Sequence, residues 1–169
     1  MPLDQRFVIM GPAGCGKSTV GAAVAARIGA RYVDGDDLHP RANIEKMSRG
    51  EPLTDADRAP WLERIGRLLA EAQDSCIVGC SALKRTYRDM IRAGARAPVS
   101  FLFLSGSREV LLQRMTTRPG HFMPVSLLDS QLQTLEPPQS DERAITVDID
   151  QPLEQLVDGL VARILEDAA

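Results

Sequence analysis

The stretch of sequence that decides the fold is Gly11-Pro12-Ala13-Gly14-Cys15-Gly16-Lys17-Ser18, which matches the phosphate-loop pattern G-x-x-x-x-G-K-[S/T] at every fixed position. An apolar strand candidate, residues 7–10, precedes this loop, and an Ala/Val-rich helix candidate, Lys17–Ile28, follows it. Glycines let the backbone wrap around phosphate oxygens without Cβ clashes, and the helix N-terminus adds partial positive charge. Because strand, loop and helix agree, the stretch predicts a nucleoside triphosphate site and not an incidental Gly-rich turn.

The loop and the first helical turn supply groups for ATP and for Mg²⁺. We expect backbone amides to point at the phosphates, Lys17 to reach the β- and γ-phosphates as a catalytic cation, and the Ser18 hydroxyl to hold Mg²⁺. The predicted nucleotide-binding residues of this segment are Gly11, Ala13, Gly14, Cys15, Gly16, Lys17, Ser18 and Thr19.

The composition is that of an ordinary globular chain. Its 169 residues fit a single domain, 1–169, with 44% hydrophobic and 25% charged residues. The net charge of −3 gives no general attraction to nucleic acid or to an anionic membrane. No apolar run approaches ~20 residues, and residues 1–6 lack the apolar core of a signal peptide. Three cysteines, an odd number, favour reduced thiols, so we expect a cytoplasmic protein without a nucleic-acid or membrane partner.

Apolar runs alternate with helical patterns along the chain. Nearly continuous hydrophobic runs predict strands that are covered on both faces, at residues 7–10, 31–34, 76–80, 99–104 and 144–149. Stretches with helical periodicity lie between and after them, such as the one that begins at Pro152 and the one that follows Thr54-Asp55-Ala56-Asp57, which resembles an N-terminal cap. Trp61 lies in the apolar pattern of the second of these, where we expect it in the core or at an interface. This order predicts an α/β fold, a three-layer α/β/α P-loop NTPase domain around a parallel sheet, with ligands at the carboxyl edge of the strands.

Carboxylates follow the second strand candidate, in Asp34-Gly35-Asp36-Asp37. In a parallel sheet this position is the carboxyl edge, close to the phosphate loop. The third strand candidate ends in Ser81 instead of the usual metal-holding Asp. We therefore expect Asp34 to support Mg²⁺ and Asp36, as a catalytic residue, to orient or deprotonate an acceptor hydroxyl. The division of roles between the two carboxylates stays open, and so does a plain turn, since Asp and Gly favour turns.

Basic residues are concentrated in later loops. Lys84 and Arg88 follow the third strand candidate on one helical face, where they are placed to clamp an anionic substrate. Arg114 and Arg118 precede a Pro-Gly break, which predicts a mobile lid at about residues 117–126 that brings cations to the phosphoryl group. The alternatives are a solvated helix face for the first pair and surface arginines favoured by the helix dipole for the second.

Several blocks of the sequence resemble gluconokinases of the phosphate-loop type, and the similarity runs from the phosphate loop nearly to the C-terminus. The blocks are Asp34-Gly35-Asp36-Asp37-Leu38-His39-Pro40, Asn43-Ile44-Glu45-Lys46-Met47, Gly50-Glu51-Pro52-Leu53-Thr54-Asp55, Asp57-Arg58-Ala59-Pro60-Trp61-Leu62, Cys80-Ser81-Ala82-Leu83-Lys84, Tyr87-Arg88-Asp89, Gly120-His121-Phe122-Met123, Ser130-Gln131, Thr134-Leu135-Glu136 and Asp148-Ile149-Asp150-Gln151-Pro152-Leu153. The resemblance implies phosphorylation of D-gluconate by ATP at its 6-hydroxyl. It also implies a nucleoside-monophosphate-kinase-like fold with a five-stranded parallel sheet and a mobile lid, and commonly a homodimer.

The resemblance also implies roles for single side chains. Arg114 would lie over the adenine face with Pro152 on its other side, and Arg118, as a catalytic residue, would approach the β- and γ-phosphates. His39 is either a substrate contact or only a helix-entry residue. Gluconate is a polyol carboxylate, so its site needs cations and hydrogen-bond acceptors. The predicted substrate-binding residues are Asp36, His39, Lys84, Arg88, His121 and Gln131.

Two other functions stay open at the level of sequence. The first is a P-loop kinase of another small acceptor, shikimate or a nucleoside monophosphate, for which Arg41 and Arg49 are candidate contacts to an acceptor phosphate. The second is a nucleotide-binding regulatory module without turnover. Such a module would tolerate loss of the acceptor acids and lid arginines, but both are present here.

Overall fold

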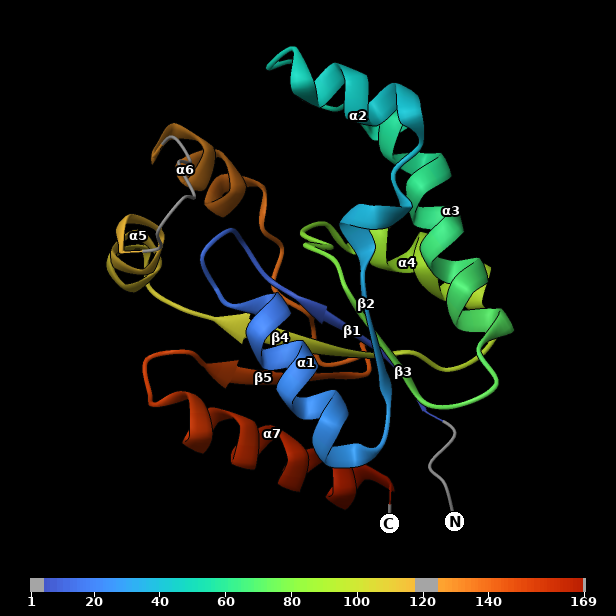
Figure 1. The fold of residues 1–169 in the computed structure, drawn as a ribbon, viewed down its shortest axis with the longest axis vertical. Helices are drawn as coiled ribbons and strands as arrows, with labels where there is room; N and C mark the ends of the chain where they lie inside the picture. The colour runs from blue at the N-terminus through green and yellow to red at the C-terminus, as the bar shows by residue number, and fades with distance from the viewer. Residues whose placement is uncertain (1–4, 118–124, 169) are drawn as a thin grey trace.

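The computed structural model describes residues 5–117 and 125–168, and the strands of this part form one sheet in the order β2-β3-β1-β4-β5 (Figure 1). All neighbouring pairs run parallel. The strands are β1 (Arg6–Met10), β2 (Arg31–Asp34), β3 (Cys76–Gly79), β4 (Ser100–Ser105) and β5 (Ala144–Asp148). Each lies within one residue of the bounds predicted from the hydrophobic runs, so the predicted five-stranded parallel sheet is confirmed.

Helices cover both faces of this sheet and complete the predicted three layers. One face carries α1 (Lys17–Ile28) and α7 (Leu153–Ala168), and the other carries α3 (Asp55–Glu71) and α4 (Arg85–Ala95) (Figure 1). The 3-10 helix η1 (Gly35–Leu38) and α2 (Arg41–Ser48) follow β2. Beyond β4, α5 (Arg108–Thr116) and α6 (Val125–Thr134) pack against each other.

The central strand β1 shows why the sheet needs helices on both sides. Phe7 and Ile9 pack in the core under α1 and α7, whereas Val8 and Met10 pack in the core under α3 and α4. Successive side chains of a strand point to opposite faces, so a run that is apolar at every position is stable only when both faces are buried. The four side chains are 0–3% exposed.

Local signals fix where the helices begin. Thr54 caps α3: its hydroxyl accepts from the Asp57 amide at 3.1 Å, and the Asp57 carboxylate accepts from the Thr54 amide at 2.9 Å. This reciprocal pair is a capping box, and it confirms the cap predicted from the sequence. Pro152 directly precedes α7, whose Leu156 amide donates to the Pro152 carbonyl at 3.0 Å.

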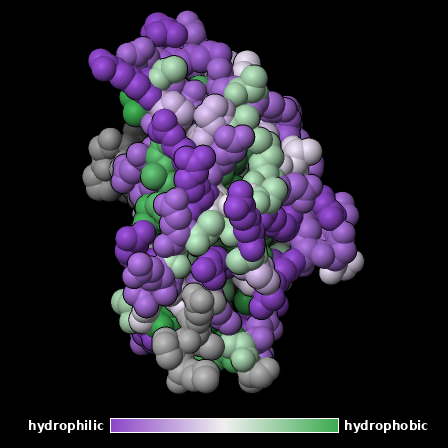
Figure 2. Space-filling model, turned by 90° about the vertical axis from the view of Figure 1, so that its right-hand side faces the viewer, coloured by the Kyte–Doolittle hydropathy of each residue, from purple (hydrophilic) through white to green (hydrophobic). Residues whose placement is uncertain are grey.

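The carboxyl ends of the strands meet at one edge of the sheet, where the connecting segments gather. The phosphate loop leaves β1 there, η1 leaves β2, and residues 80–84 leave β3 (Figure 1). The α2 helix projects beyond this edge and exposes the apolar side chains of Ile44 and Met47. The side of the molecule turned towards the viewer in Figure 2 is mainly hydrophilic, with hydrophobic residues scattered over it. Within the described ranges, no helix combines the length and apolar character that crossing a membrane requires.

Candidate functional site

The phosphate loop depends on three glycines with backbone angles that other residues rarely adopt. Gly11, Gly14 and Gly16 have φ angles of 148°, 83° and 93°. A Cβ on Gly14 would lie 2.8 Å from Met115 Cγ and 2.9 Å from the Leu111 carbonyl oxygen. The loop is therefore seated directly on α5, and both its curvature and its contact with that helix require glycine.

Lys17 lies over the loop that it follows. Its Nζ donates to the Gly11 carbonyl at 2.9 Å and to the Pro12 carbonyl at 3.3 Å. These bonds hold the ammonium group against the backbone of the phosphate loop, at the N-terminus of α1. Ser18 and Thr19 follow on the first turn and are exposed. The cation and the hydroxyl groups expected at a triphosphate site thus share one surface.

Gln131 contacts the nucleotide side of the site, although we predicted it as an acceptor for substrate hydroxyls. Its Oε1 accepts a hydrogen bond of 2.6 Å from the Ala13 amide of the phosphate loop. Gln131 lies on α6, the helix that follows residues 118–124 in the chain. The described contact therefore joins α6 to the phosphate loop, and the side-chain oxygen proposed for substrate is already used there.

The acidic segment after β2 is held by backbone and indole contacts. The Asp34 carboxylate accepts from the Asp36 amide at 3.0 Å and so caps η1. Trp61 Nε1 donates to the Gly35 carbonyl at 2.7 Å. A Cβ on Gly35 would lie 2.3 Å from the Gly79 carbonyl oxygen, so only glycine lets η1 approach β3 this closely. These contacts place Asp34 and Asp36 beside the end of the neighbouring strand.

The charges around Asp36 connect it to the phosphate loop. Desolvation raises the pKa of the Asp36 carboxyl, the neighbouring Asp34 carboxylate raises it further, and the charges of His39 and Lys17 lower it. Lys17 of the phosphate loop is thus one of the charges that favour the ionised form of Asp36. A carboxylate with a raised pKa is a better proton acceptor than an ordinary aspartate.

The donors near Ser18 suit a hard cation. Tyr32 lies on β2, the strand that ends at Asp34. Burial raises the pKa of its phenol, whose buried oxygen has no hydrogen-bond partner among the described residues. Mg²⁺ prefers oxygen ligands and commonly takes only one or two from the protein, with substrate phosphates supplying others. Among the described residues no group of three or more His, Cys, Asp and Glu side chains could hold a metal alone.

His39 is packed against the protein. It is 8% exposed, its ring stacks on Trp61 at 4.1 Å between centroids, and its Nδ1 lies 3.2 Å from Asn43 Nδ2. Burial lowers the pKa of the imidazole, although the Asp36 charge raises it. The sequence left two roles open for His39, a substrate contact or a helix-entry residue. These contacts favour the second role, at the start of α2. Trp61, expected in the core, is 5% exposed and also stacks on this ring.

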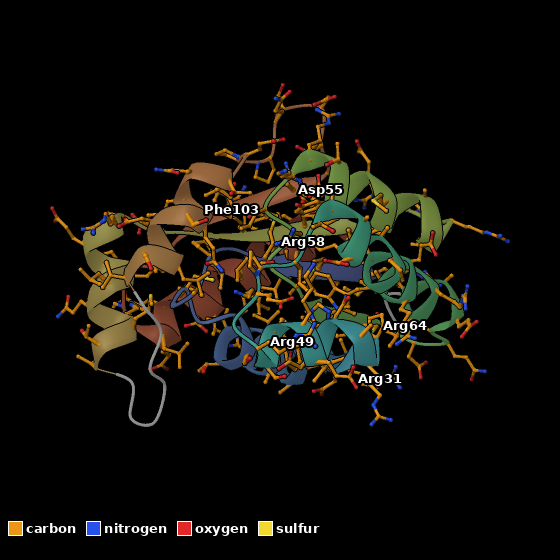
Figure 3. All side chains as sticks on the ribbon, turned by 90° about the horizontal axis from the view of Figure 1, so that it is seen from above. Arg31, Arg49, Asp55, Arg58, Arg64 and Phe103 are labelled. Atoms are coloured by element: carbon orange, nitrogen blue, oxygen red, sulfur yellow. The ribbon has the colours of Figure 1, made fainter. Side chains whose placement is uncertain are left out.

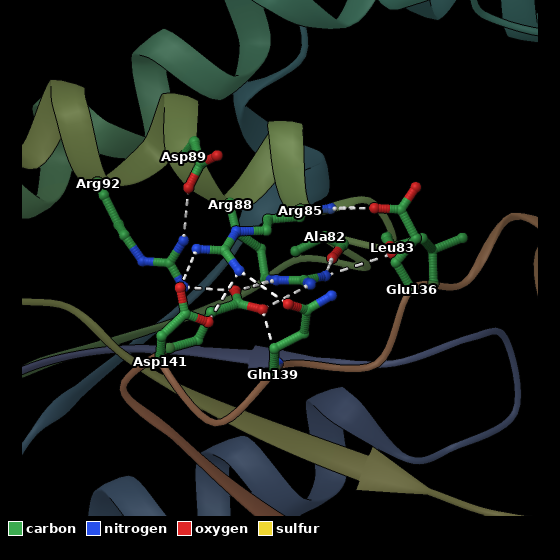
Figure 4. Close-up of polar contacts among 10 residues, drawn as sticks. Ala82, Leu83, Arg85, Arg88, Asp89, Arg92, Glu136, Gln139 and Asp141 are labelled. Atoms are coloured by element: carbon green, nitrogen blue, oxygen red, sulfur yellow. Dashed lines mark hydrogen bonds and ion pairs between the residues drawn. The ribbon is translucent and has the colours of Figure 1, made fainter.

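Arg88 is not available to a substrate, which corrects the role predicted for it. The side chains of Arg88 and Glu142 are 0% and 1% exposed and form a bidentate pair of 2.7 and 3.1 Å (Figure 4). Arg88 Nη1 also donates to the carbonyls of Ala82 and Leu83, at 2.9 and 3.3 Å. Sequence spacing placed Arg88 on the face of Lys84, but that face of α4 is covered by the segment before β5.

The same arginine holds an unusual turn. Ala82 has a φ of 44°, a left-handed conformation that is unfavourable for alanine. The hydrogen bond from Arg88 to the Ala82 carbonyl stabilises this turn. The preceding Ser81 carbonyl accepts from the Gly11 amide at 3.3 Å, so the turn also contacts the phosphate loop.

Lys84 belongs to a cluster that the sequence analysis missed. Its Nζ lies 3.5 Å from Asp55 Oδ2, and Tyr87 donates its hydroxyl to Asp55 Oδ1. Arg58 Nη1 lies 3.7 Å from the same carboxylate. These residues come from α3 and from the start of α4, so no spacing along the chain indicates their meeting. All four lie in the blocks that carry the resemblance, which was the available signal.

The structure describes some of the remaining predicted site residues and not others. Arg114, on α5, donates through Nη2 to the Ile149 carbonyl, three residues before the exposed Pro152. This contact joins α5 to the segment that leads to Pro152, the other residue predicted beside adenine. Arg118 and His121 lie outside the described residues, as does most of the predicted lid at 117–126.

A glycine-rich loop between β1 and α1, in a parallel sheet of order 2-3-1-4-5, with acidic residues at the neighbouring strand end, defines a P-loop kinase domain. An AAA-domain family model matches residues 7–138. The chain is 49% identical to the thermosensitive gluconokinase of Escherichia coli over 144 residues, 83% of this chain and 76% of the relative. It is 50% identical to a gluconokinase of Gluconobacter oxydans over 151 residues, 87% and 84% of the two chains.

Solved structures agree with the sequence relatives. A crystal structure of a gluconokinase from Sinorhizobium meliloti 1021 superposes with a TM-score of 0.88 at 48% identity and covers 99% of this chain and 97% of that one. The chain belongs to the gluconokinase family. The family predicted from the sequence blocks is thereby confirmed.

Proposed function

We propose that this chain transfers the γ-phosphoryl group of ATP to the 6-hydroxyl of D-gluconate, giving 6-phospho-D-gluconate and ADP. The observation that supports the proposal is that Lys17 binds carbonyls of the loop after β1, while Asp36 directly follows β2 at the same carboxyl edge of the sheet, in a chain of this family. A phosphoryl donor and a hydroxyl acceptor need that arrangement, since transfer depends mainly on positioning and on charge stabilisation.

The nucleotide side follows from the loop. The amides of residues 11–16 and the N-terminus of α1 bind the phosphates, Lys17 neutralises charge on the transferring group, and Thr19 contacts the nucleotide on the first helical turn. Arg114 and Pro152 flank the adenine. Ser18 and Asp34 would hold Mg²⁺, which would supply charge neutralisation at the phosphates.

Asp36 acts on the acceptor. Its raised pKa suits a group that orients the 6-hydroxyl and takes its proton as the oxygen attacks the γ-phosphorus in line. Arg118 and His121, from the lid at 117–126, bring cations over the transferring group as it closes. Lys84 supplies a cation for the gluconate carboxylate.

The cellular location and the oligomeric state are part of the same proposal. The chain acts as a single domain in the cytoplasm, which is supported by buried, unpaired thiols at Cys15, Cys76 and Cys80. It works as a homodimer, for which the exposed Ile44 and Met47 on α2 offer apolar contact surface. Light scattering of the purified protein measures that state directly.

The test is a panel of acceptors. ADP release is measured with D-gluconate, shikimate and AMP, and the phosphorylated carbon of the product is identified by NMR. We expect turnover with gluconate and phosphorylation at carbon 6. Asp36→Asn should lower kcat by about 10²–10⁴-fold with the fold intact by circular dichroism. If that variant keeps most of its gluconate-dependent ADP production, Asp36 does not take the proton.

The same panel separates the other functions. Arg41 and Arg49, candidate contacts for a nucleotide acceptor, pair with Glu45 and Glu51 on or beside α2. Their charges are thus partly neutralised, which speaks against a second phosphate there. Turnover with AMP or shikimate alone would overturn gluconate as the substrate, and ATP binding without turnover on any sugar acid would indicate a regulatory module.

A further inference from the structure

Two cations meet one carboxylate at the start of α3 and α4. Arg58 Nη1 and Lys84 Nζ lie 3.7 and 3.5 Å from the oxygens of Asp55 (Figure 3 labels Asp55 and Arg58). Tyr87 donates its hydroxyl to the same carboxylate. The Arg58 guanidinium carbon and Lys84 Nζ each lie 5.5 Å from the centre of the Tyr87 ring. The ring and the carboxylate together hold the two cations near each other.

The carboxylate in this cluster is held loosely by the cations. The Asp55 side chain is 65% exposed, whereas the side chains of Arg58 and Lys84 are 30% and 34% exposed. Its distances to both cations exceed the 2.7 Å of the buried Arg88–Glu142 pair. Exposed pairs of this kind contribute little to stability. Apart from its hydrogen bond with the Tyr87 hydroxyl, Asp55 is held by weak contacts, and Arg58 keeps its hydrogen bond to the Leu53 carbonyl at 2.8 Å when Asp55 turns into solvent.

The cluster lies next to the segment that carries the proposed base. Trp61, one turn along α3 from Arg58, donates through Nε1 to the Gly35 carbonyl at 2.7 Å and stacks on the His39 ring at 4.1 Å between centroids. The start of α3 is therefore packed against the residues on either side of Asp36. A six-carbon acid with its terminal hydroxyl at Asp36 has its carboxylate at the far end of an extended chain, and the site needs a cation there.

We propose that Arg58 and Lys84 bind the carboxylate of the sugar-acid substrate, and that Asp55 occupies this position in the unliganded enzyme as an internal competitor that the substrate displaces. The inference rests on the proposed function and adds a binding residue, Arg58, and a self-inhibiting one, Asp55. It replaces the buried Arg88 as the partner of Lys84. The enzyme should therefore bind sugar acids more tightly than neutral polyols, because a neutral polyol leaves the two cations without a counter-charge.

The test is the affinity for D-gluconate without nucleotide, measured by titration calorimetry and by the fluorescence of Trp61, the chain's single tryptophan. Asp55→Asn keeps the shape of the side chain and removes its charge. We expect its Kd for gluconate to fall about two- to five-fold, the worth of one exposed ion pair. Arg58→Gln should raise the Kd about ten-fold or more, as expected for a lost charge-assisted hydrogen bond.

Matched controls separate this effect from general charge and stability. Asp89→Asn removes an acid that pairs with Arg92 on α4, and Arg67→Gln removes an exposed cation further along α3. Neither should change the Kd. Asp55→Asn should also leave the weak binding of uncharged D-sorbitol unchanged.

The outcomes are distinct. If wild-type protein neither binds nor phosphorylates gluconate, the proposed function and this inference both fail. If wild-type binds gluconate but Asp55→Asn binds it equally or more weakly, only the inference fails, because Asp55 then orients the cations and does not compete for them. A normal Kd in Arg58→Gln overturns the assignment of the carboxylate to that residue.

Discussion

Neutralising Glu142 isolates the energetic role of the buried ion pair that holds the Ala82 turn. Glu142 accepts hydrogen bonds from Arg88 at 2.7 and 3.1 Å, from Arg92 at 2.6 Å and from the Gln139 amide at 2.9 Å. Glu142→Gln keeps the volume but leaves the Arg88 guanidinium, 0% exposed, without a counter-charge. Removing one member of a buried pair typically costs about 3–5 kcal/mol.

The matched control lies in the same loop. Asp141 pairs with Arg85 at 2.7 Å, but its side chain is 62% exposed, so Asp141→Asn should lower the stability much less than Glu142→Gln does. The assay is urea unfolding followed by circular dichroism. With an m-value of about 2 kcal/mol per M, the midpoint of Glu142→Gln should fall by about 2 M. The Arg88→Met/Glu142→Leu double variant should recover part of the loss, because neither charge then stays buried but the Ala82 and Leu83 carbonyls and the Gln139 amide lose their partners.

The pH dependence of the folding stability tests the role of the Arg88–Glu142 pair independently. Burial raises the pKa of Glu142, but the hydrogen bonds from Arg88, Arg92 and the Gln139 amide lower it to about 2. A depressed carboxyl pKa stabilises the folded state above pH 4.5, the ordinary value, and this stability is lost as the pH falls towards 2. The difference between wild type and Glu142→Gln should therefore shrink over that window. A Glu142→Gln midpoint equal to that of Asp141→Asn at pH 7 would refute the argument.

Three further predictions concern the site. Lys17→Met should lower kcat about 10²–10³-fold, measured as ADP release, because it removes a preorganised cation from the transferring group; activity near wild type would contradict this role. Gly35→Ala should weaken gluconate binding and lower the midpoint of thermal unfolding, because a Cβ would meet the Gly79 carbonyl oxygen at 2.3 Å; an unchanged Kd would show that η1 can move away freely. The lowered pKa of His39 gives stability that is present above pH 6.5 and is lost as the pH falls below it, so thermal unfolding of His39→Gln should depend less on pH between 7.5 and 5 than that of wild type.

The sequence predicted the scaffold well because each signal there was local. Continuous apolar runs located the strands, and the α1 bounds matched because Gly16 and Gly29, both with positive φ, flank the helix. The capping box at Thr54 placed the start of α3 in the same way. Such signals depend on residues a few positions apart, and no tertiary contact competes with them.

The sequence was less informative about side chains whose partners lie far along the chain. Arg88 and Lys84 look equivalent as cations four residues apart, yet Arg88 pairs with Glu142, 54 positions away. Gln131 reaches Ala13 across 118 positions. Burial and pairing of such groups depend on which segment covers them, and residue type alone does not contain that information.

By itself the sequence determined the phosphate loop, the parallel sheet and the acidic segment after β2, because periodicity and glycine positions dictate backbone conformation locally. Tertiary structure decided which cations remain free to bind a substrate. Arg88 is desolvated and paired by the segment before β5, whereas Arg58 and Lys84, from different helices, share one exposed carboxylate. The physical reason is that the strength of an electrostatic interaction depends on the distance between the charges and on their exposure to solvent, and both are properties of the folded chain.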